Sequence, residues 1–568
     1  MTQKPSILLR QLERLRERFG PEPAARKAAI VRALQRADLG TIGRIVAFHE
    51  ALCFARAYPD DSRLLAAVER ALAAFAGRTD LQRVRDRLVN SGIAGTDTVY
   101  PFGLCTAQWL AAHWPEHLRV EWKDLDDSAR LVRTLLLYAL PAEVPGLDEA
   151  PLEAPLWAGR LAGRRDSDAS WLVSRAARAI GPHWVRDRVF EELDVPIRLT
   201  AGRQTPNRTL AKFEPSPVTF QDIPMRTGRP DLLSEIRRGP VAVRPVARRD
   251  AERLIDLAHE SMVTRKRDLD AFAWADPRDV RLVECGGGLQ FALIGVQPGR
   301  RFVFESVYGL LTLRNGVPVG YALASALLGS SEIAYNVFES FRGGEAAYIL
   351  GRLLATVHAL FGSDTFSIDA YQLGGHGNDE GLDSGAWWFY YKLGFRPRAP
   401  EMRPIVAREM TRIRRQPGYR TPRHTLERLV QHNLFFSLGP RRDDVMGVVK
   451  MGRVGLAVTA MVARRFGHDR ERASAELAAE AGGQLGVRDW RRWPAAERRA
   501  WTTWAPVVGV LPGLARWTGP DRRALAAVIR AKGGVRESEF VRLFDSHTRL
   551  RRAILALCDR PDERRPSR

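Results

Sequence analysis

A short glycine-rich stretch in the middle of the sequence has residue types suited to holding a phosphate. It reads FRGGEAA from Phe341 to Ala347 and separates a strand-like alternating segment from a segment with apolar residues at helical spacing. Glycines let the backbone approach an anion, and amides at a helix N-terminus attract negative charge. The residues that we expect to bind a phosphate group are Arg342, Gly343, Gly344, Ala346 and Ala347.

Glu345 is the residue in this stretch that argues against a phosphate site. Its carboxylate would repel an anion, and it can instead cap the helix that follows. The alternative interpretation is therefore a capped surface helix that binds no ligand. The sequence leaves both interpretations open.

Other common catalytic and metal-binding patterns are not found. The sequence contains no G-x-x-x-x-G-K-[ST], H-E-x-x-H or G-x-S-x-G motif, which argues against common triphosphatases, zinc proteases and serine hydrolases. The 4 cysteines lie far apart and form no C-x-x-C pair. The sequence therefore predicts neither a disulfide framework nor a metal site.

The segments around the glycine-rich stretch alternate between predicted strands and helices. A strand followed by a helix begins at Val241, and two apolar runs meet at Asn315–Gly316, a strong hairpin signal because both residues tolerate positive φ. After the glycine-rich stretch and its helix, a strand is predicted from Asp364, then a helix that ends at Gly394, then a short strand. We expect these elements to form one α/β unit around a mixed sheet.

The order of these elements resembles that of the GNAT superfamily of N-acetyltransferases, and four local motifs resemble it too. VAVRPVARRDAERLIDLA from Val241 is similar to the family's first strand and helix, and LRNGVPVGYAL from Leu313 is similar to its next hairpin. VFESFRGGEAAYILGRLL from Val337 looks like the fourth strand and the acyl-CoA pyrophosphate loop. FYYKLGFRP from Phe389 looks like the family's signature F-Y-x-K-L-G-F. The family pattern R/Q-x-x-G-x-G/A has a small residue where Glu345 stands.

The resemblance implies an N-acyltransferase that moves an acyl group from acetyl-CoA or another acyl-CoA to a small-molecule or peptide amine. It also implies that the sheet splays between the fourth and fifth strands and admits the pantetheine arm. Tyr390 falls where many members have a tyrosine that protonates the leaving thiolate, and a phenol with a reference pKa of about 10 suits that role. Packing of the aromatic helix is the alternative role for Tyr390.

The general base is not fixed in this family, so its identification rests on the carboxylates of the predicted strands. We expect Glu332 to be the base, ahead of Glu339 and Glu305. Glu339 lies close enough in sequence to Arg342 to form an ion pair with it instead. This mechanism needs no metal.

Two other functions stay open. One is a non-catalytic binding protein built on a degenerate GNAT fold, which Glu345 favours. The other is a protein that handles RNA or aminoacyl-tRNA, supported by 88 Lys and Arg against 66 Asp and Glu, a net charge of +22 that attracts nucleic acid, anionic membranes or acidic ligands. We interpret the excess of arginine as dispersed over many helix faces, so nucleic acid is the less favoured partner.

At 568 residues the chain is too long for a single hydrophobic core. The fold class that we expect is an α/β GNAT-like mixed-sheet domain flanked by two mainly α-helical domains. The expected parts are an all-helical domain at 1–195, a linker at 196–239, the GNAT-like domain at 240–405, a helical domain at 420–560 and a disordered tail at 561–568.

The N-terminal residues are charged at helical spacing and lack the apolar stretch of a signal peptide. The most apolar segments are shorter than the roughly 18 residues that a membrane-spanning helix requires. We therefore expect a cytoplasmic protein with reduced cysteines and no membrane span.

Overall fold

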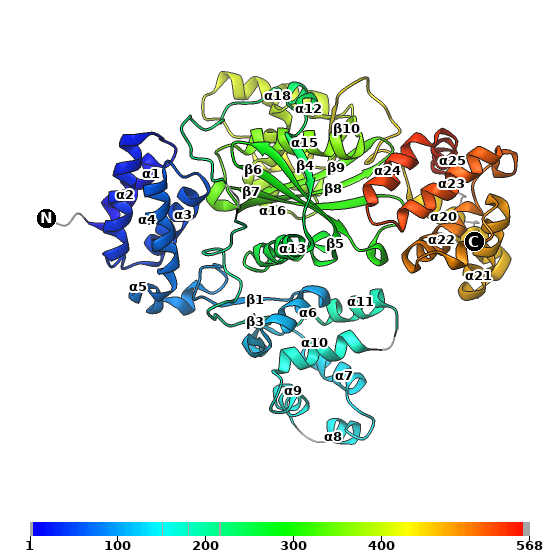
Figure 1. Ribbon diagram of the computed structural model, residues 1–568, viewed down its shortest axis with the longest axis horizontal. Coiled ribbons are helices and arrows are strands. Elements are labelled where there is room, and N and C mark those ends of the chain that lie inside the picture. The colour runs from blue at the N-terminus through cyan, green and yellow to red at the C-terminus, as the bar shows by residue number, and fades with distance from the viewer. Residues whose placement is uncertain (1–3, 150–151, 180, 215–216, 560–568) are drawn as a thin grey trace. The chain divides into compact units, whose positions relative to one another are not determined.

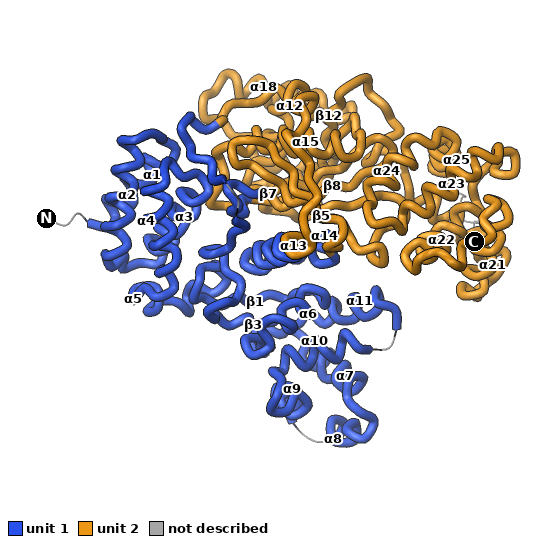
Figure 2. The backbone as a smooth tube through the Cα atoms, viewed as in Figure 1, with its two compact units in different colours: residues 1–225, 252–274, 313–319 blue, residues 226–251, 275–312, 320–568 orange. Residues whose placement is uncertain are grey.

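The computed structural model describes residues 4–149, 152–179, 181–214 and 217–559 (Figure 1). The tail expected at 561–568 lies outside the described residues. The chain divides into two compact units (Figure 2). Unit 1 comprises residues 1–225, 252–274 and 313–319, and unit 2 comprises residues 226–251, 275–312 and 320–568.

Unit 1 is mainly helical, as its apolar spacing predicts. Its first helices are α1 (Pro5–Leu15), α2 (Pro21–Arg36), α3 (Ile42–Ala57), α4 (Ser62–Ala73), α5 (Thr79–Gln82) and α6 (Leu104–His113). They are followed by α7 (Ser128–Tyr138), α8 (Val144–Glu149), α9 (Ala154–Ala162), α10 (Asp168–Arg178), α11 (His183–Leu193) and α14 (Asp270–Ala273). Helix α13 (Arg248–Val263) begins in the residues of unit 2 and ends in those of unit 1.

A small antiparallel sheet in unit 1 departs from the expected all-helical domain. Its strands are β1 (Thr98–Tyr100), β2 (Leu118–Val120) and β3 (Ile197–Leu199), with β3 in the centre. Each strand has three residues, which is too short to show an alternating pattern in the sequence.

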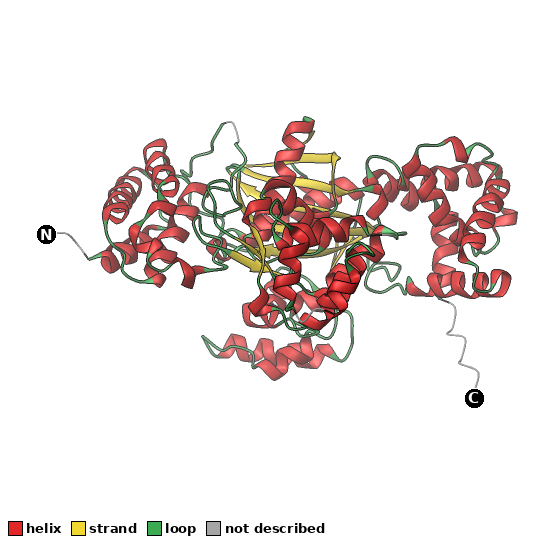
Figure 3. Ribbon diagram, turned by 90° about the horizontal axis from the view of Figure 1, so that it is seen from below, coloured by secondary structure: helices red, strands yellow, loops and turns green. Residues whose placement is uncertain are grey.

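Unit 2 is built on a large mixed sheet, and most strands of the chain belong to it (Figure 3). The order of its nine strands is β11-β12-β10-β9-β8-β7-β6-β5-β4. Strands β9 and β10 are parallel, whereas β8 and β9, like β10 and β12, are antiparallel. The strands are β4 (Ala242–Pro245), β5 (Ala275–Gly286), β6 (Leu289–Val296), β7 (Ser306–Arg314), β8 (Val317–Leu327), β9 (Ser330–Val337), β10 (Thr365–Ile368), β11 (Arg396–Pro397) and β12 (Leu434–Ser437).

The hairpin predicted at Asn315–Gly316 is confirmed. Strands β7 and β8 are neighbours in the sheet, and the two turn residues have φ values of 49° and 77°. Both angles are in the left-handed region that asparagine and glycine tolerate best. The tip of this hairpin, residues 313–319, is grouped with unit 1.

Three strands of the sheet were not predicted. Strands β5 and β6 form an extra hairpin between α13 and β7, connected through Gly287 and Gly288, which both have positive φ. Strand β12 lies at Leu434–Ser437, in a stretch expected to be helical, and inserts between β10 and β11. A short apolar run bounded by polar residues fits a strand or a helix equally well. The chain therefore returns to the sheet after residue 405.

Helix α15 (Ala346–Phe361) is the central helix of unit 2. Its apolar side chains share one core cluster with residues of β8, β9 and β10, including Ala324, Ile333 and Phe366. Burial of such side chains is the main favourable term in folding. The other helices of this region are α12 (Leu232–Arg238), α16 (Asp379–Ser384), α17 (Ala386–Lys392), α18 (Met402–Arg415) and α19 (Arg423–Leu429).

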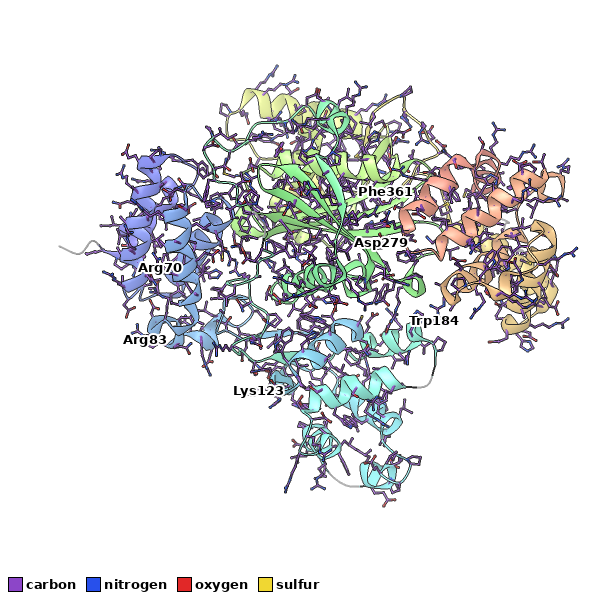
Figure 4. All side chains as sticks on the ribbon, viewed as in Figure 1. Arg70, Arg83, Lys123, Trp184, Asp279 and Phe361 are labelled. Carbon is purple, nitrogen blue, oxygen red and sulfur yellow. The ribbon has the colours of Figure 1, made fainter. Side chains whose placement is uncertain are left out.

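Six further helices form the C-terminal part of unit 2. They are α20 (Gly452–Phe466), α21 (Arg470–Leu485), α22 (Ala495–Val508), α23 (Gly519–Lys532), α24 (Glu537–Ser546) and α25 (Thr548–Cys558). Buried polar contacts join them to the sheet. Tyr308 of β7 donates a hydrogen bond to Asp279 of β5 (2.5 Å), accepts one from the amide of Ser538 (3.0 Å), and packs on Phe361. Figure 4 labels Asp279 and Phe361.

No helix among the described residues is long and apolar enough to cross a membrane.

Candidate functional site

A cavity of about 720 Å³ opens at the N-terminus of α15, entirely within unit 2. Its walls come from the segment before α12, from the loop before α15 and the first turn of α15, from α16 and α17, and from α18, α19 and the connection between them. The lining residues are Thr227, Arg229, Gly343, Gly344, Ala346, Ala347, Leu382, Asp383, Ser384, Gly385, Trp388, Phe389, Lys392, Leu393, Ile413, Gly418, Tyr419, Arg420, Thr421 and Leu426.

Four of the five residues predicted to bind phosphate line this cavity: Gly343, Gly344, Ala346 and Ala347. Gly343 has a φ of 94°, and a Cβ added to it would meet no atom within 4 Å. Glycine is therefore favoured there by the backbone angle rather than by lack of space. Ala346 and Ala347 are in the first turn of α15, where the helix offers no acceptor to their amides.

Arg342, the fifth predicted residue, is not among the lining residues. Its side chain is exposed, with one guanidinium nitrogen 2.5 Å from the Glu380 carboxylate and Nε donating to the carbonyl of Val337 at 3.3 Å. The sequence could not indicate this, because Glu380 is 38 residues away. Arg342 therefore joins the start of the loop to α16.

The Glu345 side chain points into the protein rather than into the cavity. It is 3% exposed, and its Oε1 accepts a hydrogen bond from the amide of Arg226 at 3.2 Å. The guanidinium of Arg226 lies 4.5 Å from the centre of the Tyr348 ring. The carboxylate of Glu345 thus holds the backbone of Arg226 at the start of α15. Glu345 is not among the residues that line the cavity.

Cations outnumber carboxylates in the cavity lining. Arg229, Lys392 and Arg420 line it and are exposed, whereas Asp383 is the one carboxylate among the lining residues. Asp383 lies 3.8 Å from Arg423, which offsets its charge. Such a cavity attracts anions.

The rest of the lining is largely apolar and aromatic. Trp388, Phe389, Leu393, Ile413 and Leu426 contribute to it. The indole of Trp388 donates a hydrogen bond to Thr421 Oγ1 at 3.0 Å, which ties α17 to the segment before α19. The cavity therefore combines an anion-attracting part with an apolar surface.

Strand β10 pairs with β9 only over the first three residues of β9. Their parallel pairing joins Ser330, Ser331 and Glu332 to Thr365, Phe366 and Ser367. Strand β9 continues to Val337 and remains paired with β8 along its full length. The parallel pairing thus ends at Glu332, one residue before β10 itself ends at Ile368, and we call the place where the pairing ends the fork.

Glu332 lies at this fork, on the face of β9 opposite Ile333, which packs in the core with α15. Burial raises the pKa of Glu332 to about 7, and the nearby carboxylates of Asp369 and Glu305 contribute. A carboxyl with a pKa near 7 is partly ionised at neutral pH and so can accept a proton. The structure thus gives Glu332 the proton affinity that a general base requires.

Tyr390 lies in the core. It is 3% exposed, its ring contacts those of Phe389 and Phe395, and burial raises the pKa of its phenol. Neither Tyr390 nor Glu332 is among the residues that line the cavity. The structure therefore brings the four loop residues together but not the two predicted catalytic side chains.

We predict that Tyr390→Phe keeps turnover within about twofold of wild type and changes the free energy of unfolding by less than about 1 kcal/mol. The substitution retains the ring and its contacts, and removing a polar group from apolar surroundings costs little. Steady-state assays and thermal unfolding would test this. A drop in kcat of about 10-fold or more in a folded variant would restore the phenol as the general acid.

Sequence reasoning missed three of the residues that give the cavity its charge. Arg229, Lys392 and Arg420 come from segments far apart in the chain, and no spacing rule joins them.

Among the described residues, no group of three or more His, Cys, Asp or Glu could hold a metal ion. Comparisons with models of protein families, with curated proteins and with solved structures found no match for this chain.

Proposed function

We propose that unit 2 is an N-acyltransferase that takes an acyl group from acyl-CoA and passes it to an amine. The observation that carries this proposal is the cavity at the N-terminus of α15. Its cations and helix amides suit the phosphates of CoA, and its apolar walls suit the adenine and the pantetheine arm. Its volume of about 720 Å³ is typical of small-molecule sites.

The order of elements supports a GNAT-like arrangement as part of the same proposal. Strand β4 precedes α13, the β7–β8 hairpin precedes β9 and α15, and β10 precedes α17 and β11. In the proposed arrangement, the pantetheine would pass at the fork, where the pairing of β9 with β10 ends. The extra β5–β6 hairpin and β12 are additions to the order that the resemblance implies.

In the proposed reaction, the amine nitrogen attacks the thioester carbonyl held at the fork. Backbone amides beside the fork polarise the carbonyl, and Glu332 accepts the proton that the amine loses. The new C–N bond forms as the C–S bond breaks, and CoA leaves as its thiolate. The resemblance implies that Tyr390 protonates this thiolate, but the burial of Tyr390 favours a packing role.

We predict that Lys392→Glu and Arg420→Glu each weaken the binding of CoA by about 10- to 100-fold. Each change removes a charge-assisted contact with a phosphate and adds repulsion. Both side chains are exposed, so the fold should tolerate the changes. Titration calorimetry with CoA and acetyl-CoA on the full chain measures the affinity, and excess ligand should raise the melting temperature of the wild type.

Lys450→Glu is the matched control, because it makes the same change of charge at an exposed lysine outside the cavity. Its affinity for CoA should equal that of the wild type. An equal loss in all three variants would mean that net charge alone attracts CoA. Absence of binding to the wild type would refute the proposal.

The second candidate function is a non-catalytic protein that binds CoA or a similar anion. The burial of Tyr390 favours it, because the proposed reaction then lacks its expected acid. A thiol-release assay with a panel of acyl-CoAs and amines separates the two functions. Binding of CoA without release of thiol by the wild type would support the binding protein.

A further inference from the structure

The positive charge of this chain is concentrated in its last third. Residues 1–391 contain 50 Lys and Arg against 48 Asp and Glu, whereas residues 392–568 contain 38 against 18. The net charges are therefore +2 and +20. The excess is therefore not dispersed along the whole chain, contrary to the interpretation of the sequence.

Part of this charge is explained by the proposed anionic ligand. Residues 392–428 contain 11 basic and 3 acidic residues and contribute several residues to the cavity. The helices α20–α25, with the short segment before them, occupy residues 450–559 and contain 21 basic against 11 acidic residues. The proposed acyl transfer assigns no role to this second group.

Five arginines, from α23 and from the connections on either side of α22, form a set that we call the arginine patch: Arg488, Arg491, Arg492, Arg516 and Arg523. All five side chains are exposed. The described residues place no carboxylate within ion-pair distance of any of the five, whereas Arg465 and Arg472 in the same block pair with Glu480 and Glu476. The patch therefore keeps its charge available for an external anion.

Arg522 links the two segments that carry the patch. One of its guanidinium nitrogens donates to the carbonyl of Gln484 at the end of α21, and the other donates to the carbonyl of Ala515. Arg488, Arg491 and Arg492 lie within eight residues after Gln484. Arg516 follows Ala515 directly, and Arg523 follows Arg522 directly. The two segments thus meet at Arg522.

Trp490 provides an aromatic ring among these arginines. It is partly exposed and stacks on Trp501, with ring centres 6.2 Å apart and an angle of 21° between the planes. The guanidinium of Arg491 lies 4.8 Å from the Trp490 ring centre. The packing on Trp501 fixes the orientation of the Trp490 ring, so the Trp490 side chain would lose little conformational entropy on stacking with a base.

We propose that the arginine patch, together with Trp490, binds single-stranded nucleic acid. The arginines would contact phosphates and release counterions from them, a contribution that requires no particular base sequence. Trp490 and the guanidinium planes would stack on exposed bases, which a duplex does not offer. The inference is independent of the proposed acyl transfer, because no residue of the patch lines the cavity.

The test measures binding of the full chain to a fluorescent 20-nucleotide single-stranded RNA and to a DNA of the same sequence, by anisotropy at several salt concentrations. The double variant Arg491→Glu, Arg492→Glu should bind at least about 10-fold more weakly at 100 mM salt. The slope of log affinity against log salt should also become shallower by about 1.4, because each lost phosphate contact contributes roughly 0.7. Trp490→Leu should weaken binding by about 5- to 100-fold.

The matched control is Arg464→Glu, Arg552→Glu, which makes the same change of charge at exposed arginines of α20 and α25. It should weaken binding less than threefold. An equal loss in both double variants would overturn the proposal, because the charge would then act diffusely. Tighter binding to heparin or to duplex DNA than to either single strand would also overturn it.

Folding is checked by thermal unfolding of every variant. If the glutamate double variant is unstable, Arg491→Gln, Arg492→Gln provides a milder change and should still shift the salt slope by about 1.4. A folded glutamine variant with an unchanged slope would overturn the proposal.

Discussion

Glu332→Gln is expected to lower kcat/KM for acyl transfer by about 10²- to 10⁴-fold, the range for loss of a general base. Glutamine has nearly the same shape but cannot accept the proton of the amine. Glu332 does not line the cavity, so the affinity for CoA should stay within about twofold of wild type. Thiol release measures turnover and calorimetry measures affinity.

The pH dependence gives this prediction a second readout. With a pKa of about 7, Glu332 should make kcat/KM of the wild type rise with pH until the carboxyl is ionised. The glutamine variant should lack this rise. Glu284→Gln is the control, because Glu284 lies on β5 of the same sheet and pairs with Arg244 at 3.4 Å. A glutamine variant at position 332 with full turnover and an unchanged pH profile would remove Glu332 from the mechanism.

Stability should also depend on the ionisation of Glu332, whatever the function. Its pKa is raised from 4.5 to about 7 in the folded chain, so between these values the folded chain binds more protons than the unfolded chain. Stability due to this group therefore falls as the pH rises from 4.5 to 7. At pH 8, Glu332→Gln should be more stable than wild type by about 1–3 kcal/mol, and this advantage should disappear at pH 4.

The glycine-rich loop could be predicted from the sequence because its requirements are local. A strand, a turn with positive φ and the first turn of a helix follow one another in the chain. The turn requires a residue with positive φ, and Gly343 supplies it. The Asn315–Gly316 hairpin was predictable for the same reason. Local conformation is set by neighbouring residues and so is visible in the sequence.

The charge of the cavity could not be predicted because it is assembled by the fold. Arg229 comes from the segment before α12, Lys392 from the end of α17, and Arg420 from the connection between α18 and α19. Strand β12, which follows that connection and inserts between β10 and β11, gave no distinctive pattern of its own. Contacts between distant segments leave no fixed spacing in a single sequence.

The orientation of Tyr390 was also beyond the sequence. The segment AWWFYYK is aromatic around most of the helix, so it has no polar face that would mark the side turned toward a ligand. In the structure Trp388 and Phe389 line the cavity, and Tyr390 packs in the core. Alignment with a family motif places a residue in the chain, but the rotation of the helix decides what its side chain contacts.

Glu537→Gln is expected to destabilise the protein by about 3–5 kcal/mol, the usual cost of breaking a buried ion pair. The Glu537 carboxylate is 1% exposed and lies 2.5 Å from Lys532 Nζ and 3.7 Å from Arg301 Nε. Those two side chains are 4% and 1% exposed, so the variant leaves both buried cations without the carboxylate that they share. Chemical denaturation at pH 7 measures the loss.

Glu539→Gln is the matched control, because Glu539 is an exposed carboxylate in the same first turn of α24. Glu539→Gln should lower the free energy of unfolding by no more than about 1 kcal/mol, the scale of a favourable helix-dipole interaction. Lys532→Met combined with Glu537→Gln should recover part of the lost stability, since it removes one buried cation together with its partner. If both single variants at 537 and 539 cost the same, the buried network does not hold α24 against the sheet. Arg301 Nη1 donates to the carbonyls of Lys532 and Gly534, so we expect the network to fix the whole connection before α24.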